Sequence, residues 1–131
     1  MKQNVIRQGD LAFIPMEPSN AEWVKRRYKE DPKQYGFREN GIIQEGEATG
    51  HHHKIKNPAL ARLFRPQYQN ATIITGRQPV EVEHDVANND PEYIAQQKHG
   101  DVTLDPDTVY EVKVARELAP GDQQTYHRVV D

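Results

Sequence analysis

The chain has 131 residues, a length typical of one folded domain, with 35% hydrophobic and 28% charged residues. We therefore expect a single domain over residues 1–131 with a modest core. The formal net charge is -3 with basic residues dispersed among acidic ones, which predicts no nucleic-acid or membrane partner.

The first elements expected are a strand and a helix. Residues 11–14 form an apolar stretch closed by prolines, which predicts a strand. The next segment has Ser19 as a predicted N-cap, Glu22 at the capping-box spacing, and Pro32 just after its end. We expect a short amphipathic helix there that covers one end of a sheet. The residues expected on one face of this helix are Trp23, Val24, Arg27 and Tyr28.

The rest of the chain predicts short strands and polar connections. Residues 31–41 are expected to be a loop, 41–50 a strand, and 71–84 two strands that form a hairpin around Gly76–Pro79. Residues 85–100 interrupt the strand pattern as an insertion. Two further strands surround a turn at 105–107, and the last strand is expected over 124–131. Roughly seven short strands with one helix predict a mainly β fold, a small β-sandwich or barrel.

Three of the six histidines stand together at residues 51–53. Side chains alternate along a strand, so His51 and His53 would share one face and His52 the other. Two imidazoles at this spacing can converge on one metal ion, but the site needs a third ligand. His84 follows two valines that alternate onto an inward face, and His99 precedes the strand expected after residue 101. Either would complete a three-histidine site for Zn, Fe, Mn or Ni.

A less specific interpretation of the histidines stays open. A polar triplet after a glycine is also typical of a solvated loop, and a single histidine on an apolar face is often a packing residue. The absence of cysteine excludes disulfides and cysteine-based zinc sites. No apolar run approaches the roughly 20 residues that span a bilayer. Residues 1–9 lack a signal-peptide core, and a soluble, cytoplasmic protein is expected.

Two resemblances bear on the triplet. The segment 45–53, EGEATGHHH, resembles the first metal-binding motif of cupins, although the cupin glutamate that follows and the second cupin motif are missing. A closer resemblance is to a family of short bacterial and phage-encoded proteins with QGD, GExTGHxH, a later histidine, a proline turn, YxV and RE. The matching residues are Gln8, Gly9, Asp10, Gly46, Glu47, Thr49, Gly50, His51, His53, His99, Val102, Leu104, Pro106, Tyr110, Val112, Arg116 and Glu117.

That family resemblance implies a fold and a site more than a function, because the family has no established activity. Its members tend to have His-Glu-Glu-His where this chain has Gln96, Gln97, Lys98 and His99, a loss that favours binding over catalysis. Any catalysis would use an open metal position, with Glu47 as the nearby general base. The alternative is a non-enzymatic phage virion or assembly protein of the capsid-decoration type. In that case the histidines would lie at a surface or interface and the partners would be proteins.

Overall fold

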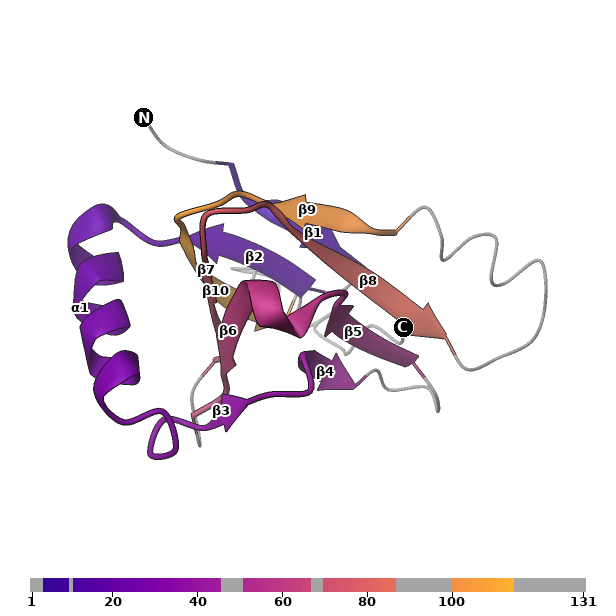
Figure 1. The fold of residues 1–131 in the computed structure, drawn as a ribbon. Helices are drawn as coiled ribbons and strands as arrows, with labels where there is room; N and C mark the ends of the chain where they lie inside the picture. The colour runs from indigo at the N-terminus through magenta and orange to yellow at the C-terminus, as the bar shows by residue number, and fades with distance from the viewer. Residues whose placement is uncertain (1–3, 10, 46–50, 67–69, 87–99, 115–131) are drawn as a thin grey trace, which may run out of the picture.

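A computed structural model describes residues 4–9, 11–45, 51–66, 70–86 and 100–114. In these ranges the chain forms two antiparallel sheets and one α-helix (Figure 1). The six-stranded sheet has the order β1-β2-β10-β7-β6-β3, with β1 Ile6–Gln8, β2 Leu11–Pro15, β10 Val109–Val114, β7 Thr72–Thr75, β6 Ala61–Phe64 and β3 Phe37–Arg38. The four-stranded sheet has the order β4-β5-β8-β9, with β4 Ile42–Glu45, β5 His51–Ile55, β8 Val80–Val86 and β9 Val102–Leu104. The predicted mainly β sandwich with one helix is confirmed.

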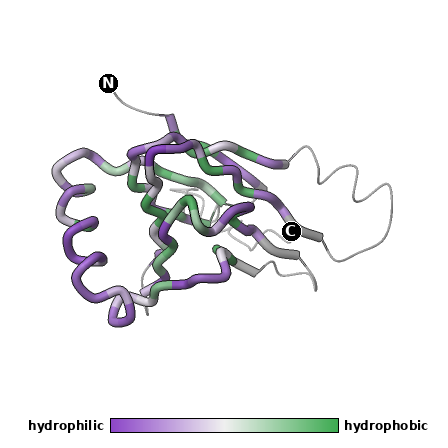
Figure 2. The backbone as a smooth tube through the Cα atoms, in the orientation of Figure 1, coloured by the Kyte–Doolittle hydropathy of each residue, from purple (hydrophilic) through white to green (hydrophobic). Residues whose placement is uncertain are grey.

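One hydrophobic core lies between the two sheets. Alternate residues of each strand point into it, as the period of two along a strand requires. The six-stranded sheet contributes Leu11, Phe13, Leu63, Ile73, Tyr110 and Val112, and the four-stranded sheet contributes Ile43, Ile55, Val80, Val82 and Leu104. Figure 2 shows hydrophobic segments along these strands and a largely hydrophilic helix. Among the described helices, none has the length and apolar character needed to cross a bilayer.

The helix α1, Pro18–Glu30, covers the outer face of the six-stranded sheet. Its buried residues Ala21, Val24 and Tyr28 pack against Phe64 of β6 and Val109 of β10. The ring centroids of Tyr28 and Phe64 are 4.4 Å apart. The helix therefore adds a second, smaller apolar layer to the sandwich, on the face that the main core does not use.

Two details predicted for α1 are wrong. Glu17 is the N-cap instead of Ser19, because Pro18 occupies the first turn, where its fixed φ and missing N–H are well tolerated. Trp23 is 55% exposed, because the buried stripe of the helix runs through Ala21, Val24 and Tyr28 and leaves Trp23 outside it. The guanidinium of Arg27 lies 4.8 Å from the Trp23 ring centroid and 4.8 Å from that of Tyr35, outside the core.

The hairpin predicted over residues 71–84 is also wrong. Both strands exist, but β7 pairs with β6 and β10, whereas β8 pairs with β5 and β9. Because both edges of β7 are occupied, the chain crosses at Gly76–Pro79 to the other sheet. The turn before β10 is tied to this crossing, since Asp107 N donates to Gly76 O at 2.7 Å and Thr108 N donates to Thr75 Oγ1 at 2.9 Å.

The strand predicted over 41–50 is described as far as Glu45, where β4 ends, and its residues 46–50 lie outside the described residues. Strand β4 pairs antiparallel with β5. The predicted loop over 31–41 contains the two-residue strand β3. The segment at 57–66 forms the 3-10 turn η1, Pro58–Leu60, followed by β6. Strand β8 extends to Val86, and the rest of the predicted insertion, like the predicted strand over 124–131, lies outside the described residues.

Candidate metal-binding site

The histidine triplet lies on β5, between β4 and β8. Opposite it on β8, His51 pairs with Val86, His53 with His84 and Ile55 with Val82. The register is unbroken, so alternation assigns positions 51, 53 and 55 to one face of the sheet. His53 is 0% exposed on this inner face. The strand interpretation of the triplet is therefore confirmed, and the solvated-loop interpretation does not hold for His53.

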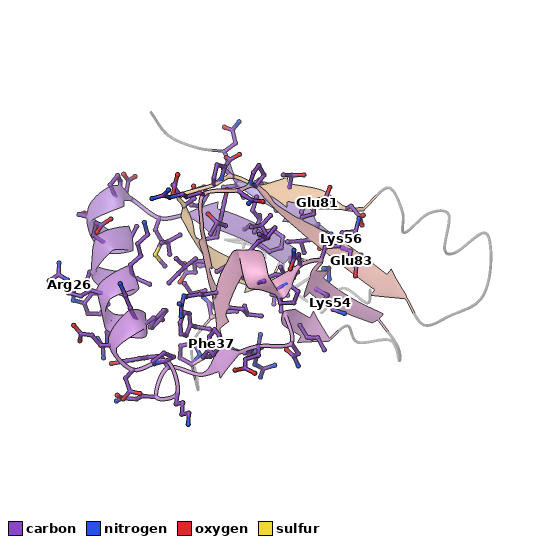
Figure 3. The ribbon with its side chains drawn as sticks, in the orientation of Figure 1. Arg26, Phe37, Lys54, Lys56, Glu81 and Glu83 are labelled. Atoms are coloured by element: carbon purple, nitrogen blue, oxygen red, sulfur yellow. The ribbon has the colours of Figure 1, made fainter. Side chains whose placement is uncertain are left out.

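The opposite face of the same sheet is charged. Figure 3 labels Lys54, Lys56, Glu81 and Glu83, which come from β5, β8 and the residue after β5. The Nζ of Lys56 lies 3.5 Å from a carboxylate oxygen of Glu81 and 3.5 Å from one of Asp101. These two carboxylates, Glu81 foremost, raise the pKa of Lys56. Glu81 lies on the solvent face, and position 52 belongs to this face by alternation.

The His53 side chain is held by Gln8, the last residue of β1. The Nδ1 of His53 lies 2.9 Å from Oε1 of Gln8. The Gln8 Nε2 donates to Val82 O at 2.8 Å and to Gly100 O at 2.7 Å. Gln8 is 2% exposed. One carboxamide therefore connects β1 of the six-stranded sheet with β5, β8 and the residues before β9 in the four-stranded sheet.

The imidazole of His84 packs face to face on that of His53. The two ring centroids are 4.4 Å apart and the ring planes are inclined by 10°. This follows from the register, because the two residues are direct cross-strand partners on the inner face. His84 follows Val80 and Val82 in the alternation, as the sequence predicted, and it is half-buried.

The four predicted ligands are described to different extents. His53 and His84 are together on the inner face, and His51 is placed in register on the same strand without a description of its side chain. His99 and Glu47 lie outside the described residues. Within the described part of the chain, no three His, Asp or Glu side chains group closely enough to hold a metal ion. The three-histidine site therefore stays a prediction.

Sequence reasoning did not single out Gln8 as a site residue. The available signal was its place in the QGD motif, directly before Gly9, which has a φ of 55°. A turn at that glycine joins β1 to β2, with Gln8 opposite Leu11. No local pattern indicates that this glutamine at a turn is buried, or that it contacts a histidine 45 positions later in the sequence.

The relationship of this geometry to known proteins rests on a family model. Neither the curated proteins nor the solved structures contain a match to the chain. The family model covers residues 7–115, a span that includes Gln8, the triplet, His84, His99 and both sheets apart from Ile6 of β1. The chain therefore belongs to the family described as a domain of unknown function, DUF8820.

Proposed function

We propose that this protein binds a divalent transition metal ion at the inner face of its four-stranded sheet, in a binding role and not a catalytic one. The observation that carries the proposal is the complete burial of His53 with one ring nitrogen held by a carboxamide. A histidine that ligates a metal commonly donates its other ring N–H to an oxygen acceptor, which orients the ring. An imidazole held in this way is prepared for coordination before the ion arrives.

The ligands in this proposal are His51, His53 and His99. The face-to-face stack argues against His84 as the third ligand. Two nitrogens that bind one ion must direct their in-plane lone pairs at the same point, about 2.0 to 2.1 Å away for zinc. Two rings stacked at 4.4 Å with a 10° inclination direct those lone pairs along nearly parallel planes. His84 is therefore assigned as a packing residue that supports His53.

A distant relationship to cupins is part of the proposal. Positions 51 and 53 belong to the inner face of a strand in an antiparallel sandwich, and the resemblance of residues 45–53 to cupins implies such a setting. A three-histidine site of this kind leaves a coordination position open for water or another small ligand. The proposed metal is Zn, Fe, Mn or Ni, since imidazole nitrogen suits these ions better than Mg or Ca.

Elemental analysis of tag-free protein from metal-replete medium tests the proposal. We expect close to one transition-metal ion per chain, and strong loss of bound metal in His51→Ala and in His53→Ala. The matched control is His52→Ala, which changes the same triplet at a position of the opposite face. Protein without bound transition metal before any chelator is used would refute the proposal. Equal losses in all three variants would refute the assigned ligands.

A second candidate is the non-enzymatic assembly role, through contacts of α1 with another protein. Trp23 favours it, because this large aromatic side chain is 55% exposed with the guanidinium of Arg27 against its ring. Aromatic residues and arginine are enriched at protein interfaces. Light scattering at increasing concentration, with Trp23→Ser as the comparison, tests self-association. A wild-type chain that remains monomeric throughout would exclude self-association through α1.

A further inference from the structure

The orientation of the Gln8 carboxamide follows from its neighbours. Its nitrogen end lies within hydrogen-bond distance of two backbone carbonyl oxygens, Val82 O and Gly100 O, at 2.8 and 2.7 Å. Carbonyl oxygens only accept hydrogen bonds, so the group that faces them must be the NH2, and both of its hydrogens are used. A flipped amide would place its oxygen against two other oxygens. The oxygen Oε1 therefore faces His53.

This orientation determines which nitrogen of His53 carries the proton. The Gln8 Oε1 has no hydrogen to donate, and it lies 2.9 Å from Nδ1 of His53. The Nδ1 must therefore be the donor. In the neutral ring the lone pair is then on Nε2, the atom on the far side of the ring from Gln8.

We infer that Gln8 is a positioning residue, which holds His53 as the Nδ1–H tautomer through its hydrogen bonds to Nδ1 and to two carbonyls and makes Nε2 the metal-binding nitrogen. The part that concerns metal rests on the proposed function. Because β1 belongs to the other sheet, Gln8 also fixes the ring relative to the contact between β1 and β9. Gln8 thus determines which nitrogen of His53 binds the ion, although Gln8 does not itself bind it.

The test is long-range proton–nitrogen NMR of the full 15N-labelled chain at about pH 8, above the ordinary histidine pKa of about 6.5. This measurement assigns each neutral imidazole to one tautomer. The wild-type chain should show His53 as Nδ1–H, and Gln8→Leu should change that signature toward Nε2–H. The matched control is Gln78→Leu, the same substitution at an exposed glutamine, which should leave His53 unchanged. Gln8→Met replaces Gln8→Leu if the latter does not fold.

Zinc is then titrated into the wild-type sample. The inference predicts that the Nε2 resonance of His53 shifts, whereas the Nδ1 atom keeps its proton. A wild-type Nε2–H tautomer, an unchanged tautomer in the folded Gln8 variant, or zinc bound through Nδ1 would each overturn the inference. Zinc that leaves every histidine signal unchanged would refute the proposed metal site and still uphold the control of the tautomer by Gln8.

Discussion

Replacing His84 separates packing from metal binding at the candidate site. His84→Ala removes the ring that lies face to face with His53 at 4.4 Å, whereas His84→Phe keeps an aromatic ring there and removes both ring nitrogens. If His84 is a packing residue, the alanine variant should lose stability and the phenylalanine variant should keep most of it. Neither variant should lose zinc affinity beyond what partial unfolding explains.

The magnitude follows from the contact and its burial. A stacked aromatic pair contributes about 0.5–1.5 kcal/mol beyond the area that it buries. Truncation also leaves a space beside the fully buried His53, and fully buried large-to-small changes cost about 2–5 kcal/mol. Because His84 is only half-buried, we expect His84→Ala to lower the free energy of unfolding by roughly 1–3 kcal/mol. For His84→Phe, a swap of similar volume, the expected cost is less than about 1.5 kcal/mol.

The assay pairs urea unfolding in the presence of chelator with calorimetric zinc titration of the metal-free protein. His99→Ala is the comparison, and it should lower zinc affinity while leaving the chelator-treated stability near that of the wild type, since a ligand contributes through the bound ion. Loss of an orienting partner typically costs about 10–100-fold in metal affinity, so a folded His84→Phe protein with a larger loss than about 100-fold would show that His84 is a ligand. Retained binding in His99→Ala would confirm that conclusion and refute the present assignment.

Three further predictions concern the scaffold. Tyr110→Phe should lower the free energy of unfolding by about 1 kcal/mol, because Asp105 N loses its acceptor. Burial raises the pKa of Tyr110, so wild-type stability should fall above about pH 10, where the unfolded chain loses the phenol proton first. Denaturation measured across pH should show a smaller fall in this variant. Gly36→Ala should lower the free energy of unfolding by at least about 1 kcal/mol in the same assay, because Gly36 has a φ of 75° and an added Cβ would collide with a backbone carbonyl. The control Gly76→Ala places its Cβ at an ordinary contact distance and should be near neutral. Lys56→Ala should change the melting temperature little, and any change should shrink as salt is added, because its ion pairs are exposed.

These predictions fail in distinguishable ways. An unchanged stability of Tyr110→Phe at neutral pH would mean that water replaces the phenol at Asp105. Gly36→Ala with wild-type stability would mean that the backbone there tolerates a side chain in another conformation. A large, salt-independent loss in Lys56→Ala would mean that the charged face of the four-stranded sheet contributes more than solvated ion pairs do.

Local sequence was sufficient for most element types and for the faces of the strands near the site. The alternation through Val80, Val82 and His84, and the separation of His53 from His52, depend only on the period of two along an extended backbone. Composition and the spacing of turns predicted a mainly β sandwich with one helix, which the structure confirms. The helix was found as well, but its start and the exposure of Trp23 depend on Pro18 and on the exact stripe that the sheet covers.

Strand pairing and the neighbours of the site were decided only by the tertiary structure. A hairpin at Gly76–Pro79 is compatible with the local residues, yet β7 already has partners on both edges, and β8 must join the other sheet. The same holds for Gln8, whose partners His53 and Val82 are 45 and 74 residues away in the chain. Edge availability and burial between two sheets are long-range properties. No local pattern carries them, so only the folded sandwich shows that Gln8 lies against Nδ1 of His53 and that the His84 ring stacks on the His53 ring.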